Sequence, residues 1–185
     1  MQVIRYSSIK TLQEDDNMHT FQQYELSQID FNPYTLIGHD WMLISAGTEE
    51  KSNSMTASWG GLGVIWGVNA ATIYVRESRF TKEFIDREKY FSLSFLSEDF
   101  RSTLSYMGKA SGRDEDKMEK SGLHYNYKHG IPYIDEASQI MICKKLAAVP
   151  ITEEHFTNPA IKTKWYAEND MHTMYIGEIV AAFAR

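Results

Sequence analysis

Residues 53–67 read NSMTASWGGLGVIWG, and this glycine-rich stretch decides between two broad fold classes. Dinucleotide-binding α/β folds carry the fingerprint G-x-G-x-x-G, with a helix directly after the glycines. The spacing of Gly61, Gly63 and Gly67 differs from that fingerprint. The residues that follow, AATIYVR at 70–76, are apolar and β-branched and predict a strand. The stretch therefore excludes a nucleotide-binding α/β fold and indicates a β protein.

Strands dominate on both sides of this stretch. Buried or alternating apolar runs predict strands over 40–48, 70–76, 90–96 and 174–183, with one or two more inside 131–149. The regular alternation of strands and helices that builds a doubly wound sheet is absent from this order.

Helix signals are few and short. An amphipathic segment follows Ser78, with Ser78 or Thr81 as its expected cap. A second helix is expected from Ser97 to a stop at Gly108, and a third, short helix is ended by Gly122. We therefore predict a mainly β fold, a β-barrel with short peripheral helices.

The bulk properties describe one globular domain. The chain has 185 residues and 43% hydrophobic content, which is enough for one packed core. Residues 1–23 are polar and show no clear period. We expect an N-terminal arm or extension over 1–23 and a single domain over 24–185.

Charge and composition exclude several classes of partner. Nucleic acid and anionic membranes both require a broad basic face, whereas the net charge here is −6. No apolar run approaches the roughly 20 residues of a membrane helix. Cys143 is the only cysteine, and the first residues do not form a signal peptide. We expect a cytoplasmic protein without nucleic-acid or membrane partners.

The segment 54–61, SMTASWGG, has the composition of a backbone that a flat ligand can approach. Small residues remove steric barriers, backbone N–H groups can bind the polar edge of a ring, and Trp59 can form a wall. A glycine-rich corner or bulge of a barrel has the same composition, and composition alone favours that interpretation by roughly two to one.

The segment 75–84, VRESRFTKEF, offers a place for a phosphate. A helix N-terminus has unpaired N–H groups and a partial positive charge, and Arg79, Ser78 and Thr81 add a cation and two hydroxyls. An ordinary cap beside an exposed arginine explains the same residues equally well.

The segment 109–117, KASGRDEDK, is a second candidate for a phosphate. Loop N–H groups and the cations Lys109, Arg113 and Lys117 can close over an anion. Three acidic residues, 114–116, dilute this signal, and a solvated charged loop is the alternative.

Metal and nucleophile motifs are missing from the sequence. The six histidines form neither H-x-x-x-H nor H-E-x-x-H, and Cys143 has no C-x-x-C partner, so we expect no metal site. A serine hydrolase is unsupported because G-x-S-x-G is absent. His172 precedes the last expected strand and can reach a pocket, although a surface position is the more frequent case.

Together and in this order, four segments resemble the flavin-reductase-like FMN-binding split barrels, and within them the flavoredoxin branch. These segments are FNPYTLIGHDWMLISAG (31–47), NSMTASWGGLGVIWG (53–67), ATIYVRESRFTKEFI (71–85) and FSLSFLSEDFRSTLSYMGKASGRDEDK (91–117). The resemblance extends from about Tyr24 to the C-terminus. It implies a split β-barrel that forms a homodimer, with one FMN per subunit near the interface.

The resemblance also implies which residues hold the cofactor. It places the isoalloxazine and ribityl chain along Met55, Thr56, Ala57 and Ser58, beside Trp59. It places the phosphate side at Ser78, Arg79, Phe80 and Thr81, and a second loop around the tail at Ser111, Gly112, Arg113 and Lys117.

Three functions remain open at this point. The first is an FMN-dependent oxidoreductase of the flavin reductase type, with NADH or NADPH as electron donor. The second is an electron carrier of the flavoredoxin type, reduced by a redox protein. The third is a small-molecule binding barrel without a redox role. Flavin carries the redox chemistry itself, so no side chain is expected to act as a catalytic acid or base.

Overall fold

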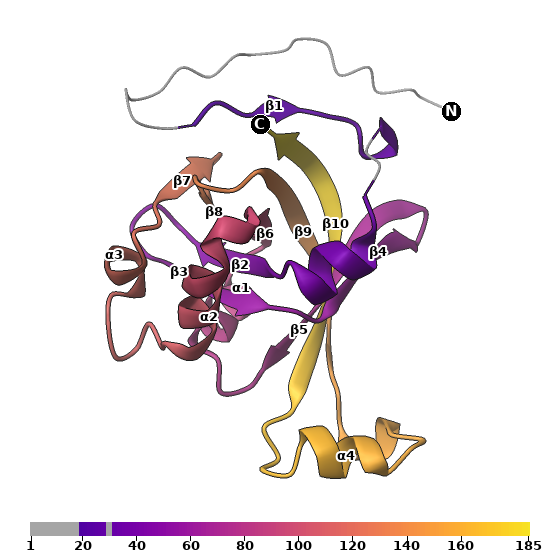
Figure 1. The fold of residues 1–185 in the computed structure, drawn as a ribbon. Helices are drawn as coiled ribbons and strands as arrows, with labels where there is room; N and C mark the ends of the chain where they lie inside the picture. Colours follow the sequence, from indigo (N-terminus) through magenta and orange to yellow (C-terminus); the bar gives the residue numbers. More distant parts are fainter. Residues whose placement is uncertain (1–18, 29–30) are drawn as a thin grey trace.

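The computed structural model describes residues 19–28 and 31–185, and strands make up most of this part of the chain (Figure 1). The strands are β1 (Gln22–Gln23), β2 (Met42–Gly47), β3 (Ser52–Ala57), β4 (Gly60–Ile65), β5 (Val68–Arg76), β6 (Tyr90–Phe95), β7 (Tyr125–Lys128), β8 (Ile131–Ile134), β9 (Gln139–Pro150) and β10 (His172–Ala184). The helical elements are η1 (Leu26–Gln28), η2 (Tyr34–His39), α1 (Phe80–Arg87), η3 (Glu98–Phe100), α2 (Arg101–Lys109), α3 (Lys117–Ser121), η4 (Glu153–His155) and α4 (Ala160–Trp165).

The strands form one curled antiparallel sheet and a separate hairpin. The order in the sheet is β3-β2-β6-β9-β10-β5-β4, with β1 paired to β10, while β7 pairs with β8. β3 and β4 are consecutive in the chain, yet they lie at opposite edges of the sheet. Only Ser58 and Trp59 separate them, so the sheet has to curl until its edges meet at these two residues. The mainly β barrel with peripheral helices is thus confirmed, and the barrel is split between β3 and β4.

Apolar side chains form two cores. The core inside the barrel includes Phe84 of α1, Phe91 of β6 and Tyr175 of β10, all almost fully buried. The second core lies under α2 and the β7–β8 hairpin, where Leu104 and Met107 are buried. α2 and the β7–β8 hairpin therefore cover one outer face of the sheet, whereas α1 packs into the barrel core and η2 lies against β4 near the split.

β6 departs from the half-exposed strand that its alternating pattern predicts. Its apolar side chains enter the barrel core, but its serines are also fully buried. The Ser92 hydroxyl donates to the Pro132 carbonyl at 2.6 Å, and the Ser94 hydroxyl accepts from the Ile134 N–H at 3.1 Å. The β7–β8 hairpin, which was not predicted, covers this polar face and satisfies its hydroxyls.

Two predicted helix ends have different outcomes. Gly122 ends α3 with φ 71°, as predicted. Gly108 does not end a helix, because it lies inside α2 (Arg101–Lys109). A Cβ atom at Gly108 would stand 3.3 Å from the Thr56 Cβ atom. Close packing of α2 on β3, rather than helix termination, accounts for this glycine.

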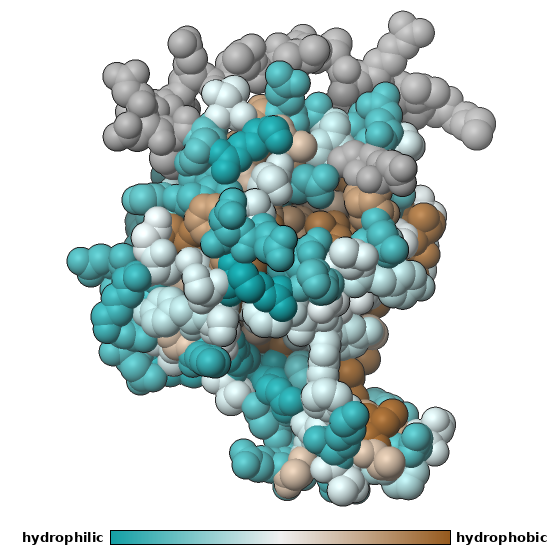
Figure 2. Space-filling view, viewed as in Figure 1, coloured by the Kyte–Doolittle hydropathy of each residue, from teal (hydrophilic) through white to brown (hydrophobic). Residues whose placement is uncertain are grey.

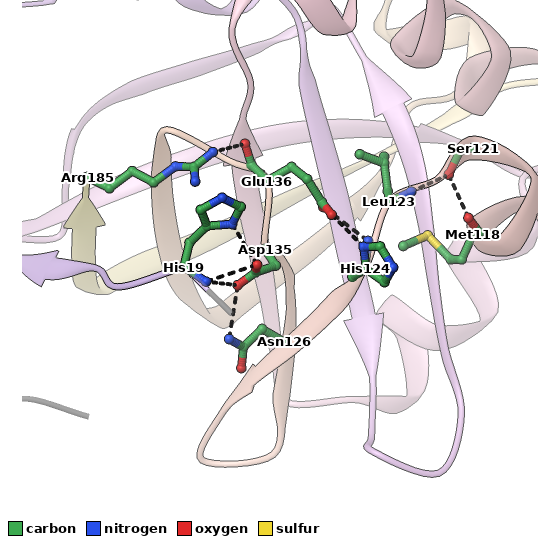
Figure 3. A network of polar contacts seen from close by, with 9 residues as sticks. All are labelled: His19, Met118, Ser121, Leu123, His124, Asn126, Asp135, Glu136 and Arg185. Atoms are coloured by element: carbon green, nitrogen blue, oxygen red, sulfur yellow. Dashed lines mark hydrogen bonds and ion pairs between the residues drawn. The ribbon is translucent and has the colours of Figure 1, made fainter. Parts of the chain in front are cut away.

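A buried carboxylate holds the first described residues on the barrel (Figure 3). Asp135 is 2% exposed, accepts the His19 N–H at 3.1 Å and lies 2.7 Å from the His19 Nδ1 atom. The Asn126 side chain donates to the same carboxylate at 3.1 Å. Of the expected N-terminal arm, residues 1–18 lie outside the described residues, and residues 22–23 pair with β10.

Candidate functional site

The start of α1 has N–H donors that no side chain caps. Arg79 occupies the N-cap position without a side-chain hydrogen bond to the helix. The Ser78 hydroxyl instead donates to Asp170 at 2.7 Å, and the Thr81 hydroxyl accepts from Asn53 at 2.7 Å. The predicted capping by Ser78 or Thr81 is therefore wrong, because both hydroxyls bind other segments. The helix N-terminus keeps its partial positive charge for another partner.

Two cations lie close together beside this helix start. Lys117, the first residue of α3, is 4% exposed, and burial first and Arg79 second lower its pKa to about 8. Burial also lowers the pKa of Arg79, with Asp170 opposing and Arg76 adding to that shift. Among the described residues neither side chain forms an ion pair within 4.0 Å, and Lys117 has only long contacts to carbonyls, at 3.4 and 3.5 Å.

Removing these cations from water is unfavourable and their mutual repulsion adds to the cost, which Asp170 and Glu115 offset only in part. An anion between Arg79 and Lys117 removes both penalties. The arrangement is therefore that of an anion site, and it brings together residues from the two segments that the sequence singled out as phosphate candidates.

The loop between α2 and α3 closes against α1 and β3. A Cβ atom at Gly112 would stand 2.3 Å from the Asn53 Oδ1 atom and 3.1 Å from the Phe80 ring, so only glycine fits there. The Arg113 guanidinium donates to the Ser78 carbonyl at 2.9 Å and to the Glu83 carboxylate at 2.6 Å. Arg113 thus connects the loop to α1. Arg79, in contrast, forms no ion pair within 4.0 Å among the described residues.

The remaining predicted residues of this loop and helix surround the same place. The Ser111 hydroxyl accepts the Arg113 N–H at 3.2 Å and shapes the turn. The Phe80 ring lies 4.9 Å from the Arg113 guanidinium. Thr81 is 1% exposed, and its hydroxyl accepts a hydrogen bond from the Asn53 side chain below the surface of the site. A role for each of them in binding stays a prediction.

β3 leads from the anion site towards the split of the barrel. Met55 and Ala57 point into the barrel core, with 6% and 8% exposure, and so they can meet a ligand only through their backbone. Thr56 points outward, and its hydroxyl donates to the Leu104 carbonyl at 2.6 Å. β3 is an edge strand, so the backbone of its outer edge has polar groups that no neighbouring strand of the sheet binds.

A cavity of about 540 Å³ lies at the split, where β3 ends and β4 begins. Its lining combines Ser58 and Trp59 of the connection with residues from η2, β4, β5 and the segment after β9. η2 is a π-helical turn, a rare conformation that is frequent at functional sites. The lining residues are Pro33, Tyr34, Ile37, Gly38, Ser58, Trp59, Gly60, Gly61, Leu62, Tyr74, Ile151 and Tyr166.

The inner wall of this cavity is a packed aromatic cluster. Trp59 is 36% exposed, packs edge-on against Trp165 at 4.9 Å between ring centres, and lies tilted against the His172 ring at 5.1 Å. The Tyr166 hydroxyl lies 2.8 Å from the His172 Nδ1 atom, and its ring stacks on Phe156 at 5.4 Å. Trp59 thus lines a cavity, and its predicted contact with a flat ligand stays a prediction.

The two glycines of SMTASWGG also serve the sheet. A Cβ atom at Gly60 would stand 2.8 Å from the Thr72 carbonyl oxygen, and a Cβ atom at Gly61 would stand 2.9 Å from the Thr72 hydroxyl. Close approach of β5 therefore requires both glycines whether or not a ligand is present. The barrel-corner interpretation is supported at this segment, and the ligand interpretation stays a prediction.

Sequence reasoning missed the segment that closes the cavity. Residues 151–171, between β9 and β10, leave the sheet and carry η4 and α4, and we call them the 151–171 excursion (Figure 1). They supply Ile151 and Tyr166 to the cavity. His172 was expected more often at the surface, but it is 6% exposed, and burial first and Arg76 second lower its pKa to about 4. No local pattern in 151–171 indicates these contacts.

Metal-binding and membrane-spanning features are absent from the described part of the chain. Residues 19–28 and 31–185 contain no group of three acidic, histidine or cysteine side chains that could hold a metal ion. None of the helices in these ranges is long and apolar enough to cross a membrane.

Comparison with protein families places most of the chain in one model. Residues 35–185 match the flavin reductase like domain. No curated protein matches the chain significantly.

Solved structures with the same fold include three described as flavin-associated proteins. An FMN-binding domain of a flavin reductase-like enzyme from Shewanella baltica is 20% identical with a TM-score of 0.65, covering 90% of this chain and 78% of its own. Flavoredoxin from Methanosarcina acetivorans is 20% identical with a TM-score of 0.61, covering 96% and 76%. An NADH:FAD oxidoreductase from Streptomyces globisporus is 15% identical with a TM-score of 0.60, covering 79% and 75%.

Proposed function

The chain belongs to the flavin reductase-like domain family, and from this premise we propose that it is an FMN-binding oxidoreductase that takes electrons from NADH or NADPH. The observation that carries the proposal is the placement of Arg79 at the N-cap of α1 with the buried Lys117 of α3 beside it, neither of them in an ion pair within 4.0 Å among the described residues. This pair and the helix N-terminus fit a phosphate monoester, which is the charged group of FMN.

The rest of the cofactor fits between the anion site and the split of the barrel. Asn53 borders the anion site through Thr81, and Ser58 lines the cavity at the end of the same strand. Five residue steps along a β-strand span about 16 Å. In the proposed pose the outer backbone edge of β3, from Met55 to Ala57, binds the polar edge of the flavin ring, and Trp59 borders it.

Bound FMN supplies the redox chemistry, accepting electrons from the donor and passing them on. The protein's residues then position and shield the cofactor. Arg79 and Lys117 fix its charged end, the β3 backbone orients its ring, and Trp59, held by Trp165 and His172, borders it on one side. No proton transfer through a side chain is required, so no residue is assigned as a catalytic acid or base.

We extend the proposal to a homodimer. An exposed apolar surface supports it: Val64 is 74% exposed and Trp66 64% exposed on and next to the edge strand β4. Figure 2 shows apolar side chains at the surface over this part of the molecule and on the 151–171 excursion. A cytoplasmic location fits the single cysteine, Cys143, which is buried as a free thiol.

A second candidate is an electron carrier whose FMN is reduced by a redox protein. The cavity supports an electron carrier, because none of the lining residues carries a charge that could bind the diphosphate of a nicotinamide dinucleotide. The same-fold neighbours also include a flavoredoxin. The third candidate, a barrel without redox function, predicts a protein that takes up no flavin.

One experiment separates these functions. The purified protein is titrated with FMN and with riboflavin, and binding is followed by flavin absorbance and fluorescence. The FMN-loaded protein is then mixed with NADH and NADPH under air. Tight FMN binding with nucleotide oxidation supports the oxidoreductase, and tight binding without oxidation but with reduction by a reduced ferredoxin supports the carrier. Absence of FMN binding removes both.

A further inference from the structure

We propose that Asp170 is an internal competitor of the flavin phosphate, and that phosphate binding at the start of α1 releases the end of the 151–171 excursion. The proposal deepens the proposed function and rests on it, because it concerns how the anion site is regulated. The contact that carries it joins the Asp170 carboxylate to Ser78. The carboxylate accepts the Ser78 N–H at 3.0 Å and the Ser78 hydroxyl at 2.7 Å.

Asp170 occupies hydrogen-bond donors that a phosphate at this place would use. Ser78 directly precedes Arg79, the N-cap residue of α1, and belongs with it to the segment predicted to bind the phosphate. Carboxylates and phosphates bind the start of a helix through the same N–H groups and the same partial positive charge. A phosphate that accepts the hydrogen bonds of Ser78 therefore has to displace the carboxylate.

Charge repulsion adds to this competition. The Asp170 carboxylate opposes the lowering of the Arg79 pKa, so its charge acts on that guanidinium. Its Oδ2 atom also lies 4.0 Å from the Arg76 Nη1 atom. Asp170 thus supplies part of the counter-charge of these cations. A phosphate brings a further negative charge to the same place and repels the carboxylate.

The Ser78 hydrogen bonds attach the end of the excursion to the end of β5. β9 and β10 carry the excursion away from the body of the barrel (Figure 1). At the same place the Arg76 guanidinium donates to the carbonyls of Asp170 at 2.5 Å and Trp165 at 3.1 Å. Displacing the carboxylate removes the Ser78 part of this attachment, so the excursion becomes looser at this end while Arg76 still holds its backbone.

Release of this end changes the cavity at the split of the barrel. Tyr166 of the excursion lines the cavity, and Trp165 packs on Trp59, which lines it too. Two sites that are coupled through one element influence each other with the same free energy in both directions. Phosphate binding therefore loosens the wall at Tyr166, and contacts that order this wall weaken phosphate binding. Occupancy of the anion site in this way regulates access to the cavity.

Two substitutions at Asp170 and one control measure the competition. Asp170→Asn removes the charge and retains an amide acceptor, whereas Asp170→Ala removes both. Glu168→Gln, at an exposed position of the same excursion, removes the same charge outside the contact. Fluorescence titration with FMN and with riboflavin, which has no phosphate, gives the ratio of the two affinities for each protein.

The expected changes have a sign that a purely structural role of Asp170 does not produce. A competing contact lowers the apparent affinity by the fraction of molecules in which the donors are free, so Asp170→Ala should raise the ratio of FMN to riboflavin affinity about tenfold and Asp170→Asn about threefold. Glu168→Gln should leave the ratio unchanged. A structural role alone predicts weaker binding of both flavins.

Hydrogen exchange of peptides from residues 160–171 measures the release of the excursion. Inorganic phosphate is the probe, because it has no ring that could touch the cavity, and sodium chloride at the same ionic strength is its control. We expect saturating phosphate to accelerate exchange of these peptides at least about threefold in the wild type, because a weakly held segment opens more often. Asp170→Ala should show no acceleration, because its excursion is already released.

The outcomes keep this proposal separate from the proposed function. An unchanged or lower affinity ratio in both Asp170 variants, an equal rise in Glu168→Gln, or unchanged exchange in phosphate overturns the competition. FMN binding by the wild type is read independently from the flavin spectrum. A wild type that binds no FMN refutes the proposed function, and the exchange measurement then still decides whether Asp170 competes with phosphate.

Discussion

Asp170 accepts two hydrogen bonds from Ser78, one from its N–H at 3.0 Å and one from its hydroxyl at 2.7 Å, although 92 residues separate them in the chain. The pair connects the end of the 151–171 excursion to the residue before Arg79. Tyr166 of the excursion lines the cavity. Asp170, near the end of the excursion, binds the segment that holds the anion site. The positions of the two halves of the candidate site are therefore linked through one carboxylate.

Replacing Asp170 should separate these two halves. Asp170→Ala loses both hydrogen bonds to a charged acceptor, and we expect the free energy of unfolding to fall by about 1–2 kcal/mol. Asp170→Asn retains an acceptor for the N–H and a donor for the hydroxyl, so its loss should be less than half as large. Urea denaturation measures both variants. Equal stability of Asp170→Ala and the wild type would show that the connection contributes nothing.

Arg79→Ala should weaken FMN binding specifically. Removing a charged hydrogen bond to the phosphate costs about 1.5 to 3 kcal/mol, whereas riboflavin, which has no phosphate, should bind as before. Lys89→Ala is the control cation, because Lys89 is exposed and lies outside both segments predicted to bind phosphate. Fluorescence titration with both flavins measures the effect. Unchanged FMN affinity in Arg79→Ala removes this residue from the site.

The FMN affinity should also depend on pH through Lys117. Burial and Arg79 lower the Lys117 pKa to about 8, so above pH 8 Lys117 is mostly neutral in the free protein. It then has to take up a proton when the phosphate binds. The ratio of FMN to riboflavin affinity should therefore fall as the pH rises from 7 to 9.5, by up to tenfold per unit. Lys117→Met should lack this decline, and Lys109→Met, at an exposed position, should retain it. A flat wild-type ratio would contradict the assignment.

The sequence predicted β2, β5, β6, β9 and β10 from local patterns but assigned no strand to β3 or β4, and the anion site stays a prediction. Alternating and buried apolar runs identified the central strands, and the cations near residues 79 and 117 stood in two short, separate segments. That both segments meet at one place follows from the loop after α2 packing on the start of α1, where Arg113 donates to the Ser78 carbonyl at 2.9 Å, a contact between distant residues that no local pattern indicates.

The parts that could not be predicted depend on contacts between distant segments. The 151–171 excursion is mostly polar, and its one buried aromatic, Tyr166, is 5% exposed because Phe156 and His172 surround it. The π-helical turn of η2 has no sequence signature. Capping was predicted wrongly at α1, because Asn53 and Asp170 bind the two hydroxyls that a local view assigns to the helix.

A glycine in β10 limits how tightly the barrel core can pack. A Cβ atom at Gly177 would stand 2.7 Å from the Phe91 ring, and Phe91 is fully buried. Gly177→Ala should therefore destabilise the protein by about 1–3 kcal/mol. Gly63→Ala, in the edge strand β4, meets nothing within 4 Å and should cost far less. Thermal unfolding of the two variants compares them, and equal melting temperatures would show that the core adjusts around Gly177.

His172 should make the protein sensitive to mild acid. Burial first and Arg76 second lower its pKa to about 4, whereas an unfolded chain has an ordinary histidine pKa near 6.5. As the pH falls below 6.5 the unfolded chain binds the proton and the folded chain does not, so stability decreases until the pH passes 4. The contribution of this single group amounts to about 2–3 kcal/mol over that window.

His172→Asn isolates this contribution, since an amide can still bind the Tyr166 hydroxyl but does not titrate. Its free energy of unfolding should be lower than that of the wild type at pH 7.5, and the difference should shrink towards pH 4. His129→Asn is the control: His129 is exposed and has φ 52°, a conformation that asparagine tolerates. If the wild type and His172→Asn lose stability in parallel between pH 6.5 and 4, then His172 is protonated in the folded protein, and the tight packing of Trp59 and Tyr166 around a neutral imidazole has to be revised.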